Sequence, residues 1–411
     1  MGSIAAMETA SRGGERYERR RQAIVAAATE LLNIHGAKGM RLADVAAKLN
    51  LTTTSVTYYY KRKEDLAVAC FTDGLDFFRQ MTAEAARPAE APERVRRFIH
   101  LYLAAMARVR QGQQAPVPVF SDIRALKEPH HTQMVQAFGA MRRGVAELFR
   151  TSDCDWMGPD ERMARAHNLV EQVLWSDAWL FRYALDDFPR LEERMTDIIV
   201  NGLSVSRGWA PVRLWPLNPE RRTDRSGQEM FLDAATRLIN QRGYRGASVN
   251  GIAAELNLTK GSFYHHNEGK DDLVVACFKR SYQFMREIQR QVRGLEGDEW
   301  GRLASAAAAL VEHQLSANGP LIRTSALSAL PVEIRAEMVR RSQRVSDHFA
   351  AMVSDGVAEG CIRPVDPLLA SQMITAMINA ASDLPGLTPQ VGQDEVARLY
   401  ARPLLVGFFR Q

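Results

Sequence analysis

The chain contains an internal duplication, which limits its possible fold more than any other feature of the sequence. With an offset of 207 residues and no gap, residues 27–71 match residues 234–278 at 21 of 45 positions. The sequence LNLT at 49–52, for example, returns at 256–259. Solenoid repeats have periods of about 20–50 residues, which is much shorter. The period therefore predicts that a whole protein of about half the present 411 residues was duplicated.

Composition predicts a soluble, intracellular protein. Hydrophobic residues make up 46% of the chain and charged residues 25%, which is ordinary for a globular protein. The sequence contains no run of 18 apolar residues, so no transmembrane helix is predicted. Residues 1–15 also lack the apolar core of a secretory signal. The four cysteines form no CxxC pair, which argues against a disulfide framework or a zinc site. We therefore expect a cytoplasmic protein without a metal or cofactor.

Positive charge is concentrated in two segments of similar length. Residues 16–80 contain 11 lysines and arginines against 7 acidic residues, and residues 221–290 contain 12 against 8. Two basic segments predict a polyanion bound at two points. A basic surface that is simply solvated would give the same excess, so charge alone leaves both interpretations open.

Apolar residues recur at helical spacing through most of the chain, which predicts an all-α fold. In residues 20–34, Ile24, Ala28 and Leu31 fall on one face, and the matching helix of the second repeat shows the same pattern. Gly36 and Gly243 follow these helices, where a terminal glycine is common. Amphipathic helices are also predicted over 94–110, 161–185, 300–316 and 333–356.

Each repeat contains a short helix, a tight turn and a second short helix. In the first repeat, Asn50 and Leu51 form the predicted turn, and Thr52 can cap a helix that runs through Tyr59. The outer side chains of this second helix are small hydroxyl residues followed by aromatic residues. Such a helix fits the major groove of DNA, where hydroxyl groups reach base edges and tyrosines can bond phosphates.

Both segments resemble the DNA-binding domain of TetR-family transcriptional regulators. The first repeat reads RLADVAAKLNLTTTSVTYYYKRKEDL at 41–66, and the second reads SVNGIAAELNLTKGSFYHHNEGKDDL at 248–273. The resemblance implies a three-helix DNA-binding head in each repeat, followed by a helical body that binds a ligand and dimerises. It also implies that the lysines at Lys63 and Lys270 contact phosphate.

The predicted contacts to double-stranded operator DNA occupy matching positions in the two heads. They are Arg41, Thr52, Thr53, Thr54, Ser55, Thr57, Tyr58, Tyr59 and Lys63 in the first head, and Ser248, Thr259, Lys260, Gly261, Ser262, Tyr264, His265, His266 and Lys270 in the second.

The two heads depart from the family pattern in different places. Thr57 replaces the family's phosphate-binding tyrosine, for which Tyr58 can substitute, and Arg41 replaces the hydroxyl cap that Ser248 keeps. The family's phenylalanine is replaced by Tyr60 in the first head and by Asn267 in the second. These differences favour two heads that read unlike half-sites, although a head that no longer binds DNA is the alternative.

The sequence divides into two units of the same plan. We expect a disordered N-terminus (1–15), a first head (16–77), a first body (78–206), a proline-containing linker (207–223), a second head (224–284) and a second body (285–411).

The simplest arrangement packs the helices near 161–206 against those near 366–410 as an intramolecular pseudo-dimer. A homodimer of the whole chain, with four heads, is the alternative.

The bodies resemble the family's ligand-binding domain only loosely, so their predicted pocket rests on residue type. A small apolar or aromatic effector is expected. Trp175 and Trp179 lie four residues apart and are predicted to share a helix face. Tryptophan and methionine at helical spacing are also typical of a core or a dimer interface. The ligand candidates are Trp156, His167, Trp175, Trp179, Tyr183, His313, Met338, His348, Met352 and Met373.

The sequence thus predicts a DNA-binding transcriptional regulator, most simply a ligand-responsive repressor. It would place its two heads on one pseudo-palindromic operator. The alternative is a ligand-sensing or protein-interaction module in which one or both heads have lost DNA binding. An enzyme is not expected, because no nucleophile–base pair or catalytic motif is recognisable.

Overall fold

A computed structural model describes residues 2–206, 208–214, 227–255, 269–316 and 318–410. These residues are mostly helical and form no β-strand; an isolated bridge joins Ser204 to Ile362. The all-α expectation is therefore confirmed. No helix among the described residues is long and apolar enough to cross a membrane.

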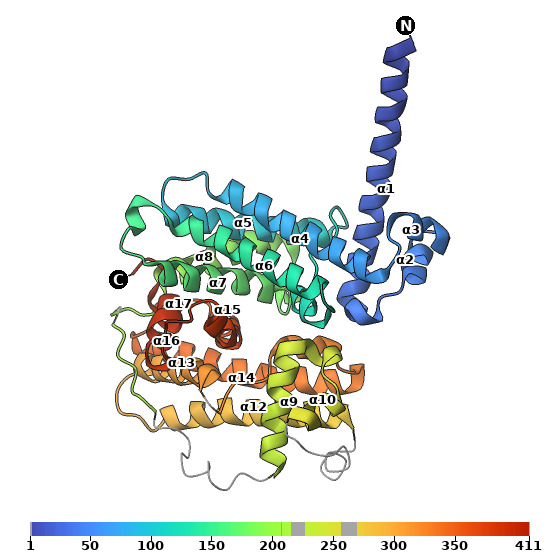
Figure 1. Ribbon diagram of the computed structural model, residues 1–411. Coiled ribbons are helices and arrows are strands. Elements are labelled where there is room, and N and C mark those ends of the chain that lie inside the picture. The colour runs from blue at the N-terminus through green and yellow to red at the C-terminus, as the bar shows by residue number, and fades with distance from the viewer. Residues whose placement is uncertain (1, 207, 215–226, 256–268, 317, 411) are drawn as a thin grey trace. The chain divides into compact units, whose positions relative to one another are not determined.

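Helices of the first repeat are followed by helices of the second in the same order (Figure 1). The first repeat contains α1 (Gly2–Gly39), α2 (Leu42–Lys48), α3 (Thr53–Tyr59), α4 (Lys63–Ala85), α5 (Ala91–Arg110), η1 (Phe120–Ala125), α6 (His130–Ala146), α7 (Pro159–Ser176) and α8 (Phe188–Asn201). The second contains α9 (Gly227–Gly246), α10 (Val249–Glu255), α12 (Lys270–Val292), α13 (Glu299–Leu315), η7 (Thr324–Ala329), α14 (Val332–Glu359), α15 (Pro367–Ala380), α16 (Gln393–Val396), a π-helical turn (Ala397–Ala401) and α17 (Arg402–Val406).

The chain forms two compact units that do not coincide with the two repeats. The first unit consists of residues 1–80 and 105–141, and the second of residues 81–104 and 142–411. The second unit thus contains α7 and α8 of the first repeat as well as the whole second repeat. The domain limits expected from the sequence stay a prediction, because they were defined by the repeat and not by packing.

In the first unit, α1 runs from the N-terminus into the first head. Gly36 interrupts it with a φ of 69°, a conformation that glycine adopts at little cost, so the predicted terminal glycine is confirmed. Helix α1 begins at Gly2 and so includes most of the segment expected to be disordered, 1–15; that expectation stays a prediction.

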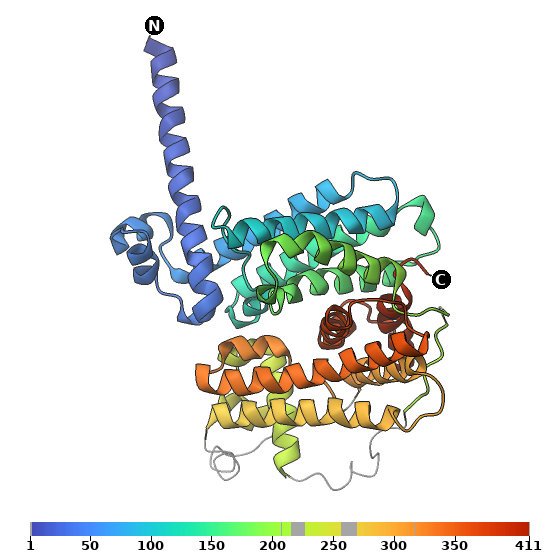
Figure 2. The same cartoon turned by 180° about the vertical axis from the view of Figure 1, so that it is seen from behind.

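In the second unit, α12, α13 and α14 pack on one another, and α15 packs on both α14 and α7 (Figure 2). The helix pair α8 and α17 also lies in contact. Part of the predicted linker is fixed to this unit: Ser305 Oγ accepts a hydrogen bond from Val212 N at 2.8 Å, and Trp300 Nε1 donates to Gly208 O at 3.1 Å. The rest of the predicted linker, residues 207 and 215–223, lies outside the described residues.

Candidate DNA-binding heads and helical bodies

The first head contains the predicted helix–turn–helix. Asn50 turns the chain with a φ of 53°, and Leu51 N donates to Ala46 O at 2.8 Å. Thr52 then caps α3, because its Oγ1 accepts a hydrogen bond from Ser55 N at 3.2 Å. Val56 is completely buried and anchors α3 to the core. The predicted turn and cap are therefore both confirmed.

The predicted DNA contacts of the first head lie on the open side of α3. Thr52, Thr53, Thr54 and Tyr58 are exposed, whereas Ser55, Thr57 and Tyr59 are half-buried. Thr57 Oγ1 donates to Thr54 O at 3.0 Å within the helix. This exposed row of hydroxyl groups has the size and chemistry to enter a major groove.

The two cationic residues that flank the helix–turn–helix are placed differently. Arg41 is exposed at the N-cap of α2 and gives it no side-chain hydrogen bond. Lys63 Nζ donates to Lys38 O at 2.6 Å. An ammonium group has three donors, so Lys63 can join the end of α1 to a phosphate.

The second head repeats this plan as far as the structure describes it. Gly243 has a φ of 68° and matches Gly36, and Ser248 Oγ accepts a hydrogen bond from Gly251 N at 3.0 Å. Lys270 Nζ lies 4.3 Å from the centre of the Tyr244 ring. The other predicted contacts, together with Asn267, lie outside the described residues: Thr259, Lys260, Gly261, Ser262, Tyr264, His265 and His266.

An asparagine fixes the loop before η1 to the first head, and a matching asparagine fixes the loop before η7 to the second. Asn33 Nδ2 donates to Val117 O at 2.9 Å, and Asn33 Oδ1 accepts from Val119 N at 2.9 Å. The matching Asn240 bonds Leu321 O and Arg323 N at 2.8 and 2.9 Å. This role was not predicted from the sequence, although an identical asparagine in both amphipathic helices was a visible signal.

Cys70 and Cys277 occupy matching positions in the two repeats, and each lies in the core of its head. Cys70 Sγ donates to Val25 O at 3.7 Å, and Cys277 Sγ donates to Leu232 O at 3.6 Å. Burial raises the pKa of Cys70 to about 12 and that of Cys277 to about 11. Both thiols are therefore protonated at neutral pH, which fits a role in the core and does not favour redox sensing.

In the second unit, the ends of α8 and α17 exchange backbone hydrogen bonds. Leu203 N donates to Leu405 O at 2.7 Å, and Phe408 N donates to Ile199 O at 2.9 Å. Each bond runs from the residue after one helix to a carbonyl near the end of the other. Such reciprocity is what a two-fold related pair of helices produces.

The interface between the repeats also contains buried polar side chains from α7. Gln172 Nε2 donates to Met373 O at 3.0 Å, and the wholly buried His167 pairs its Nε2 with Ala380 O at 3.1 Å. Arg165 Nε donates to Phe408 O at 2.7 Å. The ligand candidates His167 and Met373 thus lie where the two repeats meet.

A buried ion-pair network adjoins His167. Its imidazole, Glu171 and Asp383 bring one possible metal-ligand atom each within 4.8 Å of one another. However, Arg323 forms a two-point ion pair with Asp383, in which Nη1 lies 2.8 Å from Oδ2. Burial lowers the pKa of His167, so the imidazole is neutral at neutral pH. With Asp383 already neutralised by an arginine, this donor set favours a structural ion-pair network over a metal centre.

The aromatic ligand candidates of the first repeat do not form one surface. Helix α7 ends at Ser176, and Trp179 has a φ of −136°, so the prediction that Trp175 and Trp179 share a helix face is wrong. The apolar pattern continues across this break because the next 3-10 turn buries Leu180. Trp179 is buried with its ring 5.9 Å from that of Tyr183, and the Arg165 guanidinium lies 5.2 Å from the centre of the Trp156 ring.

The ligand candidates of the second repeat lie mainly in its core. His313 stacks on Phe284 with 3.8 Å between ring centres, and burial lowers its pKa to about 3. His348 Nδ1 lies 3.2 Å from Arg293 Nη2. Met338 and Met352 are buried. Their roles in ligand binding therefore stay predictions.

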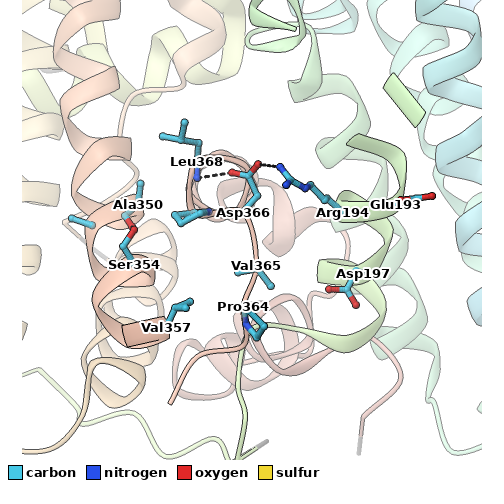
Figure 3. A pocket seen from close by; sticks show the side chains of 12 residues that line it. Glu193, Arg194, Asp197, Ala350, Ser354, Val357, Pro364, Val365, Asp366 and Leu368 are labelled. Carbon is cyan, nitrogen blue, oxygen red and sulfur yellow. Dashed lines mark hydrogen bonds and ion pairs between the residues drawn. The ribbon is translucent and has the colours of Figure 1, made fainter. Parts of the chain in front are cut away.

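A groove of about 730 Å³ lies elsewhere, between α8 of the first repeat and α14 and α15 of the second (Figure 3). Ala350, Val357 and Leu368 supply apolar surface, and Arg194 pairs with Asp366 at its edge. None of the predicted ligand candidates lines it. The sequence offered no signal for this groove, because its walls come from segments more than 150 residues apart.

The geometry defines a helix–turn–helix DNA-binding regulator with a duplicated plan. The family model for bacterial regulatory proteins of the tetR family matches residues 24–70 and 231–277, and that for a tetracyclin repressor-like C-terminal domain matches 296–383. The chain is thus a TetR-family regulator with two tandem units, as the sequence predicted.

The relatives and solved structures that resemble this chain each match less than half of it. The HTH-type transcriptional repressor DhaR of Mycobacterium sp. (strain GP1) is 27% identical over 142 residues, which are 33% of this chain and 70% of that protein. The uncharacterised HTH-type transcriptional regulator YhgD of Bacillus subtilis (strain 168) is 23% identical and is covered to 91%, by 42% of this chain. A structure of AibR with isovaleryl coenzyme A and operator DNA is 24% identical, with a TM-score of 0.36, covering 44% of this chain and 97% of that one.

Proposed function

We propose that one chain performs the work of a regulator dimer and represses transcription from a single pseudo-palindromic operator. The observation that carries this proposal is the reciprocal pair of hydrogen bonds between Leu203 and Leu405 and between Phe408 and Ile199. Because this pairing lies within one chain, it can supply the dimer contact that links two heads. The two recognition helices would then occupy successive major grooves, about 34–36 Å apart.

In this proposal the open face of α3 and its counterpart in the second head read unlike half-sites. The exposed Thr53 and Thr54 contact base edges, and Lys63 and Lys270 contact phosphates. The role is regulatory and not catalytic.

We further propose that a small apolar or aromatic effector acts through the bodies. Coupling of this kind typically changes DNA affinity 5–150-fold. The groove between α8, α14 and α15 supports an effector that bridges the two repeats, because binding there changes how their helices fit together. The buried aromatic residues of each body are the alternative place.

The test measures binding of the full chain to DNA flanking its own gene, at fixed salt, together with the mass of the complex. Fixed salt is needed because phosphate contacts make affinity salt-dependent. One chain on each specific site supports the proposal, and two chains would point to a four-headed homodimer. Loss of specific binding, with an effector still bound, would favour the ligand-sensing module instead.

A further inference from the structure

The N-terminal part of α1 carries an exposed basic surface that the helix–turn–helix does not use. Figure 1 shows α1 continuing past α2 and α3 toward the N-terminus. We call residues 14–21 of this helix the α1 arm. Its side chains Arg16, Arg19 and Arg20 are all exposed.

Tyr17 holds the α1 arm against the end of the recognition helix α3. Its ring centre lies 4.8 Å from that of Tyr59 and 6.3 Å from that of Tyr58. One turn later, Arg21 Nη1 lies 3.4 Å from Tyr60 Oη and its Nη2 lies 2.7 Å from Glu18 Oε1. The arm is therefore positioned by the same helix that carries the predicted DNA contacts.

Two arginines of the arm lie beside this aromatic contact. Arg16 and Arg20 are four residues apart and share one helix face, and Arg20 is three residues from Tyr17. Neither forms an ion pair with any residue that the structure describes, whereas Arg21 is already paired with Glu18. Arg19 is also exposed, but at about 100° per residue it lies on the side of α1 opposite Tyr17, and its Nε donates to Glu15 O at 3.4 Å. Tyr58 is 74% exposed and Tyr17 43%, which leaves an open surface of phenol and guanidinium groups.

The second repeat lacks these residues at the matching positions. With the same offset of 207, Arg16, Tyr17 and Arg20 correspond to Thr223, Asp224 and Gly227. The second repeat has arginines nearby, at 221, 222 and 225, but these match Gly14, Glu15 and Glu18 of the arm. The arm is therefore a feature of the first head alone.

We propose that Arg16 and Arg20 of the α1 arm bind backbone phosphates just outside the half-site that the first head reads. The chain then contacts a longer stretch of DNA beyond the first head's half-site than beyond the second head's half-site. This inference rests on the proposed DNA-binding function and adds a contact beyond the helix–turn–helix. Guanidinium groups are suited to phosphate oxygens, and tyrosine hydroxyls can add a bond to the same strand.

The expected effect follows from counterion release. Each neutralised phosphate contributes about −0.9 to the slope of log affinity against log salt. The double variant Arg16→Ala/Arg20→Ala should therefore lower the magnitude of the slope by about 2 and weaken binding about 30-fold at about 0.15 M salt. The control Arg19→Ala removes one arginine of the same arm from the side opposite Tyr17 and should change affinity less than about twofold.

The experiment uses the full chain and a DNA fragment that the wild-type chain selects from a random-sequence library. The fragment is shortened stepwise from either end, and affinity is measured for the wild type, the double variant and Arg19→Ala. We expect shortening at one end to weaken the wild type and the control, but not the double variant. Shortening at the other end should affect all three proteins equally.

The outcomes separate this inference from the function on which it rests. If the wild type binds a selected fragment but the double variant has the same salt slope and the same sensitivity to shortening, the arm does not bind phosphates. The helix–turn–helix function then stands. If the wild type selects no sequence, both the inference and the DNA-binding proposal are overturned.

Discussion

Gly202 lies so close to Gly407 that a β-carbon built on Gly202 would be 2.5 Å from the backbone nitrogen of Gly407. It would also be 2.2 Å from the carbonyl carbon of Val406. The reverse contact is nearly as close, since a β-carbon on Gly407 would be 2.7 Å from Val200 O. The crossing of α8 and α17 thus requires a glycine from each repeat.

We predict that Gly202→Ala lowers the free energy of unfolding by at least about 3 kcal/mol, because the backbone of α17 cannot yield as a side chain can. The control is Gly112→Ala. Gly112 has the same φ of 71° but no atom within 4 Å of its β-position. It should cost only the 1–2 kcal/mol of a left-handed residue. Urea unfolding measures both, and equal losses would contradict the close crossing.

Asn240→Ala should remove the hydrogen bonds that fix the loop before η7 to the second head. The partly buried Arg323 N–H then loses its acceptor, which costs up to about 1–3 kcal/mol. Hydrogen exchange should show faster exchange at Arg323 than in the wild type. Asn201→Ala is the control, because the one bond that the described residues show for its side chain is to Asp197 on its own helix. Unchanged protection at Arg323 in Asn240→Ala would mean that the asparagine does not fix the loop.

Arg41→Ser should stabilise the first head. Ser248 caps α10 through Gly251 N, whereas Arg41 gives α2 no side-chain bond. A serine N-cap is typically worth about 1 kcal/mol, so the midpoint of unfolding should rise. Arg41→Ala removes the same charge without adding a cap and should give no such gain. If both variants behave alike, the gain is not due to capping.

His313 should make the protein less stable in acid. Burial lowers its pKa to about 3, below the ordinary value near 6.5, so the unfolded chain binds the proton more tightly. Stability from this group is complete above about pH 6.5 and falls as the pH drops toward 3. Between pH 6.5 and 5 the loss is at most about 2 kcal/mol.

His313→Gln removes this titration. Its free energy of unfolding should depend less on pH below 6.5 than that of the wild type, while the two pH profiles stay parallel above pH 7. Chemical unfolding at a series of pH values makes the comparison. Profiles that are parallel over the whole acid range would show that His313 does not titrate on unfolding.

Local rules predicted the parts of the site that depend on neighbouring residues. The turn at Asn50, the cap at Thr52 and the glycine after the first helix all follow from residue type and spacing within one turn of helix. Features that depend on long-range packing were not predictable in this way. The close approach at Gly202, for example, is decided by residues 405–407, far away in the chain.

The buried hydrogen bond from Gln172 to Met373 O has a consequence for how this interface can change. In a homodimer, every substitution occurs in both subunits, so a change at Gln172 would alter both halves of the two-fold interface. Here Gln172 of the first repeat bonds a backbone carbonyl of the second repeat, and each repeat is encoded separately. A single mutation can therefore alter one side of the contact and leave the other intact. The two repeats are free to specialise as partners, and only their mutual fit is constrained.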